Sequence, residues 1–472
     1  MIYDKQKAKG VNRLDNSQKF IELREKYKTF SYNSFSISEN DDEINIEFEF
    51  EIENLKKFNP TIKILKKNML LKNLNSDFVK KLVFHMGLIE LISYWKAVCC
   101  PNVVIKCGNI NEEQKEWFKK LYYYGLGELF YTNNIKTTID EFMTITCTGE
   151  KNDSLAEDAE YNNYIIPIGG GKDSVVTLEI LKNEKKRKAL IINPKPITLE
   201  CAKLAGIENE NIIEVYRKID LRLIDLNKQG FINGHTPFSS MLAFLSYFIG
   251  YITNTKYIAL SNESSANESN VEGEKINHQY SKTYEFENDF KEYTDKYLKT
   301  PVRYFSFLRP LTEIQIAKLF SKYEQYHKVF KSCNVGSKEK EWKWCCNCPK
   351  CLFVYTILSP FLYKDKLLNI FGEDLFEKET LEKTFIELLG YGETKPFECV
   401  GTYREVRFAA SKVISILEKE NKELPYLLKL YKENYELENL KIDILNEYNN
   451  ENNLTKEQNE RLRKEVFENN DK

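Results

Sequence analysis

The sequence has no apolar run long enough to cross a membrane. Its most apolar segment, FVKKLVFHMGLIELISYW, contains Lys80, Lys81, His85 and Glu90, which is typical of a buried helix rather than a membrane span. No basic segment followed by an apolar stretch opens the sequence, so we expect no export signal and a cytoplasmic protein. We assign His85, inside this apolar helix, a structural role.

An excess of positive charge is also missing. The 472 residues include 69 Lys and Arg against 71 Asp and Glu, a formal net charge of −2. This balance gives no global reason to expect a nucleic-acid partner. Eleven cysteines in a long chain without an export signal favour reduced thiols and metal ligation over a disulfide framework. We expect a small-molecule substrate and no membrane partner, and these properties carry no prediction of oligomeric state.

Two common phosphate-binding motifs are absent, but a glycine loop of another type is present. The segment YIIPIGGGKDS at Tyr164 to Ser174 is an apolar strand that leads into three glycines and then opens a helix. No GK[ST] closes the glycine run, and the GxGxxG spacing is missing. Glycines can bring backbone N–H groups close to a phosphate, and a helix N-terminus adds a positive dipole end. We therefore predict a nucleotide-phosphate cradle.

The polar residues of this loop have predicted roles. Ser174 can donate a hydroxyl hydrogen bond, Lys172 can counter phosphate charge, and Asp173 can hold Mg²⁺ directly or through water. The loop resembles the PP-loop, SGGxDS, of enzymes that split ATP between its α and β phosphates, with Gly169 where that family usually has Ser. The alternative, a structural glycine turn, is disfavoured because strand, glycines, Asp-Ser and helix occur in the required order. The predicted nucleotide-binding residues are Gly169, Gly170, Gly171, Lys172, Asp173, Ser174 and Asn262.

The residue pattern divides the chain into parts. Residues 1–150 are predicted to form a smaller α+β domain, with the alternating strand EINIEFEFEIE, a helix over about 77–97, the strand NVVIKC and a helix over about 111–124. The polar run 151–163 is a predicted linker. Over 164–410, short apolar strands separated by helices predict an α/β, Rossmann-like parallel sheet with ligands at the carboxyl ends of its strands. Residues 411–472 are a predicted helical, charged and solvated tail, and residues 1 to about 40 receive no element.

A cysteine cluster is the second strong signal. Cys345, Cys348 and Cys351 are spaced CxxCxxC within WCCNCPKC, and eleven residues separate Cys333 from Cys345. Four thiolates can close a tetrahedral, structural Zn²⁺ site. An iron–sulfur cluster takes similar ligands, but an ATP-splitting sheet gives it no evident task, so we favour zinc. Cys346 is a spare cysteine, and its side chain is expected to point elsewhere.

An unusually polar segment follows the strand KYIAL. Residues 261–290, SNESSANESNVEGEKINHQYSKTYEFENDF, gather Asn, Glu, His, Gln and Lys directly after a strand end. A solvated loop is the alternative, but such a loop seldom carries His, Gln and Tyr side by side at a strand's carboxyl end. A second polar turn, NGHTPF at 233–238, precedes an apolar helix. We assign its lone His235 a structural role.

Together these segments resemble a known family. The chain resembles the MurL family, UDP-N-acetyl-α-D-muramoyl-L-alanyl-L-glutamate epimerases, whose fold is of the PP-loop, or adenine nucleotide alpha hydrolase-like, class. The resemblance covers about residues 75–410. Its motifs are GLIELISYWKAVCCP, YGLGELFYTNNI, IPIGGGKDS, NGHTPFS, LSNESSANE, NHQYSK with YEFE, FSFLRPLTE, SCN with WCCNCPKC, and KPFECVGT.

The resemblance implies an ATP- and Mg²⁺-dependent inversion of the terminal L-Glu of UDP-MurNAc-L-Ala-L-Glu, with release of AMP and diphosphate. Adenylation removes the carboxylate charge and turns the carbonyl into an electron sink, which makes the α-hydrogen easier to remove. Inversion then needs proton removal from one face and return to the other. Besides Asp173 and Lys172 in the loop, the candidates for the proton steps are Cys399, His278, Lys282, Glu263 and Glu268. An inert buried Cys399 is an open alternative.

Three other functions share some of these sequence features. 7-Cyano-7-deazaguanine synthases also join a PP-loop to a four-cysteine zinc site, but they are shorter and lack counterparts of the first domain and of KPFECVGT. A tRNA-modifying sulfurtransferase would call for a basic tRNA face. A nucleotide-sensing defence protein would keep the loop without turnover.

Overall fold

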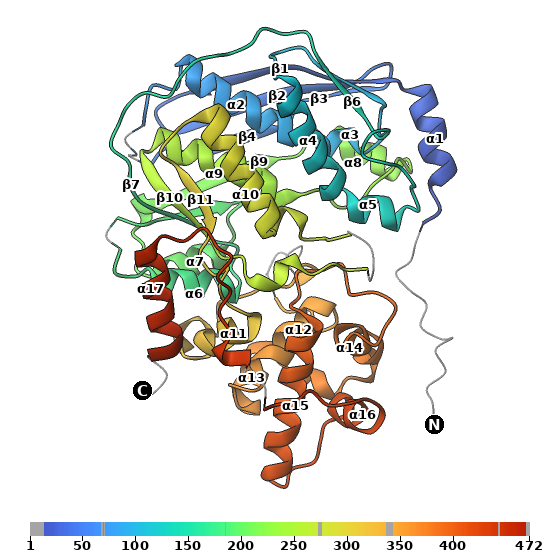
Figure 1. Cartoon of the computed structure of the whole chain (residues 1–472), viewed down its shortest axis with the longest axis vertical. Helices are drawn as coiled ribbons and strands as arrows, with labels where there is room; N and C mark the ends of the chain where they lie inside the picture. Colours follow the sequence, from blue (N-terminus) through green and yellow to red (C-terminus); the bar gives the residue numbers. More distant parts are fainter. Residues whose placement is uncertain are drawn as a thin grey trace.

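Strands from both halves of the chain form one eleven-stranded sheet (Figure 1). The computed structural model describes residues 14–67, 69, 71–184, 186–271, 276–336, 343–441 and 444–468. The strand order is β11-β10-β7-β8-β9-β4-β2-β1-β5-β6, and β3 pairs with β2. Within these residues, no helix combines the length and the apolarity that a membrane span requires.

The half of the sheet that carries the glycine loop is parallel. Its strands are β7 (Asn162–Pro167), β8 (Lys188–Ile192), β9 (Ile212–Lys218), β10 (Thr255–Leu260) and β11 (Arg303–Ser306). All four neighbouring pairs run parallel. Successive residues of β7 enter different cores, since Ile165 packs in one and Ile166 in the other. Both faces are therefore covered, as the strand and helix alternation predicts, whereas β11 was not predicted.

The other half of the sheet is mixed. Its strands are β1 (Thr29–Glu39), β2 (Glu43–Ile52), β3 (Lys56–Phe58), β4 (Thr61–Leu65), β5 (Asn102–Ile105) and β6 (Thr144–Cys147). The predicted alternation in β2 is confirmed, because its three isoleucines and two phenylalanines are fully buried. β4 pairs antiparallel with β9 and so joins the two halves. The division into domains at residues 150–164 stays a prediction, since one sheet runs through both parts.

The first part of the chain contains elements that the sequence pattern did not predict. Residues up to 40 received no assignment, yet they include α1 (Ser17–Lys26) and β1, which pairs with β2 and β5. The helix expected over about 77–97 is two helices, α2 (Asp77–Glu90) and α3 (Ile92–Trp95). The next helix is α4 (Glu112–Gly125), which begins at a capping box made by Asn111 and Gln114. The further helices that pack in the same core are α5 (Gly127–Thr132), α8 (Leu221–Lys228), α9 (Phe238–Ile252) and α10 (Tyr284–Tyr293). α9 packs against both α2 and β10, and α10 packs against β11.

The helices of the second core lie below the sheet in Figure 1. α6 (Lys172–Ile180), α7 (Pro196–Leu204) and α11 (Glu313–Ser321) pack in the core that also contains α12 (Pro349–Leu358), α13 (Lys364–Phe371), α14 (Glu382–Leu388), α15 (Tyr403–Lys419) and α16 (Tyr426–Asn434). The tail returns to the sheet through α17 (Lys456–Arg463), where Gln458 Nε2 donates to Tyr164 Oη on β7 at 3.0 Å. The prediction of a solvated tail is wrong for α17, because Leu462 is fully buried against this core.

Candidate active site

The glycine loop lies between β7 and α6, at the carboxyl end of a central parallel strand. Gly170 has φ +84°, a conformation that favours glycine, and its carbonyl oxygen accepts the Lys331 N–H at 2.8 Å. A Cβ built on Gly169 meets no heavy atom within 4 Å, so space is open beside the loop. Gly171 caps α6, and Ser174 Oγ donates back to the Gly171 carbonyl at 3.0 Å. The loop therefore leaves room for a bound group at the helix N-terminus.

A buried ion-pair network lies under this loop. The Lys172 ammonium contacts the carboxylates of Asp173 and Glu313, and the Lys172 and Glu313 side chains are each 2% exposed. Burial alone would lower the pKa of Lys172, but the two carboxylates raise it above its usual value. Burial raises the pKa of Glu313, and its ion pair with Lys172 opposes this rise. Burial alone would raise the pKa of Asp173, but Lys172 and Lys350 hold it below its usual value.

Three carboxylates converge at this point. Oxygen atoms of Asp173, Glu263 and Glu313 lie within 4.8 Å of one another. Asp173 comes from α6, Glu263 follows β10 and Glu313 begins α11, so the carboxyl ends of the strands bring them together. A set of carboxylate oxygens beside a phosphate cradle fits Mg²⁺. Asn262, predicted to bind nucleotide, follows β10 in the same way as Glu263, and its Nδ2 donates to Ser306 Oγ at 3.0 Å.

A second cluster surrounds Cys399. Lys282 Nζ donates to Cys399 Sγ at 3.0 Å, and His278 interacts electrostatically with this thiol. Burial alone would raise the pKa of the thiol, but Lys282, His278 and Lys350 lower it to about 5. The Lys350 ammonium donates to the Cys399 carbonyl oxygen. Cys399 is therefore a thiolate held among three cationic side chains.

His278 connects this thiolate to the first part of the chain. Its Nδ1 lies 2.5 Å from Glu128 Oε2 on α5. Burial alone would lower the pKa of His278, but Cys399 and Glu128 raise it to about 9. The ring of His235 lies 4.2 Å from the ring of His278, centroid to centroid. Burial and the neighbouring His278 lower the pKa of His235 to about 3. His278 thus carries the positive charge of the pair.

The structure brings together most of the residues predicted from sequence and adds others. Cys399, His278 and Lys282 lie in one cluster, and Lys282 interacts electrostatically with both Glu263 and Asp173 beside the loop. Glu268 forms an ion pair with Lys395, at 2.5 Å. Sequence reasoning missed four residues at the site, Glu128, His235, Glu313 and Lys350. Each of the four lies inside a quoted motif (YGLGELF, NGHTPFS, LRPLTE and CPKC), so membership in those motifs was the available signal.

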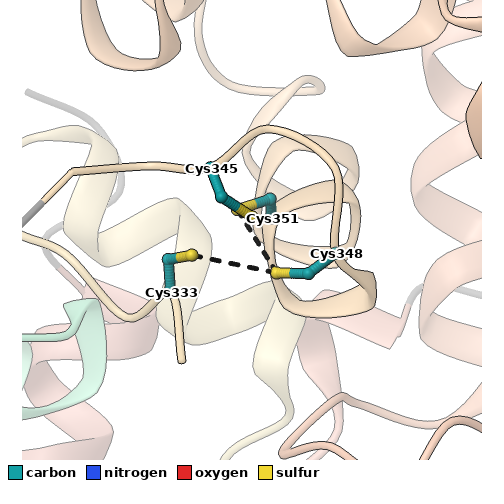
Figure 2. Close-up of side chains that lie close together, drawn as sticks. All are labelled: Cys333, Cys345, Cys348 and Cys351. Carbon is teal, nitrogen blue, oxygen red and sulfur yellow. Dashed lines mark hydrogen bonds between the residues drawn. The ribbon is translucent and has the colours of Figure 1, made fainter. Parts of the chain in front are cut away.

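The four predicted metal-ligating cysteines also converge (Figure 2). Their sulfur atoms are 3.9 Å apart for Cys333 and Cys348, 3.7 Å for Cys345 and Cys351, and 3.5 Å for Cys348 and Cys351. A tetrahedral Zn²⁺ with Zn–S bonds of about 2.3 Å separates its sulfurs by roughly 3.8 Å, so the set fits zinc. Cys346 points elsewhere, with its sulfur 3.2 Å from the Phe371 carbonyl oxygen. Lys350 lies between the ligands Cys348 and Cys351 in the sequence, and its hydrogen bond to the Cys399 carbonyl oxygen connects this four-cysteine site to Cys399.

Comparisons with known proteins agree along most of the chain. The sequence profile of the MurL N-terminal domain matches residues 21–307, and that of the MurL C-terminal domain matches residues 329–441. A protein of Xanthomonas oryzae pv. oryzae is 31% identical over 348 residues, 72% of this chain and 76% of its own length. A protein of Micromonospora sp. is 32% identical over 335 residues, 69% of this chain and 73% of its own length. Both carry the name UDP-N-acetyl-alpha-D-muramoyl-L-alanyl-L-glutamate epimerase. No solved structure matches.

Proposed function

Because this chain belongs to the MurL family, we propose that it is an isomerase of peptidoglycan precursor synthesis that inverts the terminal L-Glu of UDP-MurNAc-L-Ala-L-Glu to D-Glu. We further propose that it adenylates the glutamate carboxylate with ATP and releases AMP and diphosphate. One observation carries the proposal: the glycine loop with its carboxylates adjoins the cluster of Lys282, His278 and Cys399. We place the reaction in the cytoplasm, where thiols that ligate a metal stay reduced.

The chemistry explains why both clusters are needed. Removing the α-hydrogen beside a free carboxylate would create a second negative charge next to the first. A mixed anhydride with AMP removes the first charge and lets the carbonyl oxygen accept electrons. Splitting ATP between the α and β phosphates supplies the AMP group, and the two reactions must therefore occur side by side.

The loop side of the site is assigned to adenylation. Backbone N–H groups of Gly169 to Ser174 and the N-terminus of α6 would hold the departing diphosphate. Mg²⁺ held by Asp173, with Glu263 and Glu313, would neutralise phosphate charge. Lys172 keeps the Asp173 and Glu313 carboxylates in place through its ion pairs.

The other side is assigned to proton handling. Cys399, His278 and Lys282 hold ionisable atoms next to the adenylation residues, and Lys282 faces both groups. The four-cysteine site is assigned a structural Zn²⁺. This ion would hold the segment around Lys350 in place, and through the Lys350 hydrogen bond also the Cys399 backbone.

The rival functions receive less support. The two MurL profiles together match residues from both halves of the chain, including the first part that a deazaguanine synthase would leave unexplained. No observation among the described residues specifically favours a tRNA-modifying enzyme or a nucleotide sensor over the epimerase.

Release of diphosphate tests the proposal. The protein is incubated with ATP, Mg²⁺ and UDP-MurNAc-L-Ala-L-Glu, and diphosphate is measured with a coupled enzyme assay. We expect release that depends on the dipeptide with terminal L-Glu. Release with a deazaguanine carboxylate or with tRNA, and none with the dipeptide, would replace the epimerase with one of the rivals.

A further inference from the structure

Cys399, His278 and Glu128 belong to one group of interacting side chains. His278 interacts electrostatically with the Cys399 thiol, and its Nδ1 lies 2.5 Å from Glu128 Oε2. A thiol, an imidazole that faces it and a carboxylate that orients the imidazole form the arrangement that activates a cysteine nucleophile. Glu128 lies 150 residues from His278, so the fold assembles this arrangement from distant segments.

We infer that Cys399 is a covalent nucleophile, which takes the glutamyl group from AMP as a thioester before the α-carbon is inverted. This inference rests on the proposed function, because it requires an acyl adenylate. The group that Cys399 accepts is the activated carboxyl group of the dipeptide's terminal glutamate. Nothing in the proposed adenylation step itself requires a cysteine.

The reaction balances in four steps. Attack by the Cys399 thiolate forms a C–S bond, and AMP leaves with the electron pair of the broken C–O bond. A base then removes the α-hydrogen as a proton, and the electron pair moves onto the thioester carbonyl oxygen. Return of a proton to the opposite face restores the C–H bond with inverted configuration. Water finally cleaves the C–S bond to give the carboxylate, the thiolate and two protons, which equals the proton balance of ATP hydrolysis to AMP and diphosphate.

The surroundings of the sulfur fit a nucleophile better than a base. Lys282 at 3.0 Å, His278 and Lys350 all stabilise the anion, which favours a thiolate over a thiol that has taken up a proton. Once the sulfur is acylated, its charge is gone and Lys282 loses the nearest of its anionic partners. The Lys282 ammonium is then available to stabilise the negative charge that develops on the thioester carbonyl oxygen.

His278 also changes role on acylation. Beside the thiolate, it carries a proton that Cys399 and Glu128 stabilise. Loss of the thiolate charge weakens its hold on that proton. His278 can therefore exchange a proton with the α-carbon or with the attacking water, whereas Glu128 is a positioning residue that acts only through His278.

The direct test is detection of the thioester. The full-length protein is mixed with ATP, Mg²⁺ and UDP-MurNAc-L-Ala-L-Glu, quenched in acid within milliseconds to seconds, and analysed by intact and peptide mass spectrometry. We expect an ATP-dependent adduct of dipeptide minus water on the peptide that contains Cys399, which neutral hydroxylamine removes. Cys147→Ser, which changes a partly buried cysteine at the end of β6, should form the same adduct.

A second test separates a nucleophile from a proton-transfer group. A dipeptide that ends in α-methyl-L-glutamate has no α-hydrogen, so proton chemistry at that carbon is impossible. If Cys399 is a nucleophile, Cys399→Ala should lower AMP release from this analogue by at least about 100-fold, while diphosphate exchange into ATP persists. Unchanged AMP release, or full inversion of the natural dipeptide by Cys399→Ala, would overturn the inference.

Glu128 has its own readout. The charged groups that face the thiol are Lys282, His278, Lys350 and Glu398. Glu128→Gln removes the carboxylate that supports the His278 charge, so the pH midpoint of Cys399 alkylation should move upward, and Glu128→Asp should restore it in part. An unmoved midpoint would remove Glu128 from the arrangement. Failure of diphosphate release in the wild-type protein would count against the proposed function instead, so the two failures are distinguishable.

Discussion

Replacing Lys172 with Met tests how the carboxylates beside the glycine loop are held. The Lys172 ammonium contacts Asp173 and Glu313, and Lys172 and Glu313 are nearly inaccessible to solvent. Removing one partner of such a network leaves uncompensated buried charge, which costs about 3 to 5 kcal/mol. We therefore expect Lys172→Met to lower the free energy of unfolding by this amount, which reduces the ratio of folded to unfolded protein by about 10² to 10⁴.

A second substitution shows whether charge is the cause. Glu313→Gln removes one of the facing carboxylates and keeps the shape of the side chain. In the double variant, the remaining carboxylates repel each other less, so the two effects should fall short of their sum by roughly 1 to 3 kcal/mol. This shortfall is the quantity that identifies electrostatics rather than lost packing.

Urea denaturation at neutral pH without added Mg²⁺ measures the wild type, the two single variants and the double variant. Lys182→Met is the matched control, because Lys182 is 60% exposed and its ion pair with Glu179 is long, at 3.9 Å. The control should stay within about 0.5 kcal/mol of wild type. A cost below 1 kcal/mol for Lys172→Met, or full additivity in the double variant, would refute the account of this network.

Three further outcomes are expected. Asp173→Ala should abolish AMP formation while the circular dichroism spectrum stays native, and retained ATP cleavage would contradict the role of the loop. Cys348→Ser should lose bound zinc in elemental analysis whereas Cys346→Ser keeps it, and equal zinc in both would mean that the four cysteines are not the site. Burial lowers the pKa of His85 to about 4, so between pH 6.5 and 4 the unfolded state binds more protons than the folded state. As the pH is lowered through this range, the free energy of unfolding should fall by about 3 kcal/mol. His85→Gln should flatten that part of the stability curve, and an unchanged slope would exclude His85 as its source.

Local patterns in the sequence predicted local structure well. The alternation in β2 and the four apolar runs of the parallel sheet indicated their strands, because side chains on a strand alternate between two faces. β1 escaped prediction because its apolar residues change from even to odd positions between Tyr32 and Phe35, where its pairing with β2 shifts register. The pairing of β4 with β9 joins residues about 150 apart, and no local pattern specifies such a contact.

The site was predictable in its parts but not in its connections. The spacing of residues in the sequence indicated the glycine loop and the cysteine ligands, and the family motifs indicated Cys399, His278 and Lys282. The sequence had no means of showing that Glu128 meets His278, or that Glu313 completes the ion pairs of Lys172, since both contacts join segments more than 140 residues apart. His235 was assigned a structural role as a lone histidine, and only the fold places its ring against His278.

Chiral analysis of glutamate after reaction in deuterated water tests the central proposal most directly. The protein is incubated in D₂O with ATP, Mg²⁺ and UDP-MurNAc-L-Ala-L-Glu, and the terminal glutamate is then hydrolysed and separated by configuration. The account predicts D-Glu that carries one deuterium at the α-carbon, formed only with ATP and in step with AMP. Glutamate that stays in the L form, or D-Glu that retains the original α-hydrogen, would contradict it.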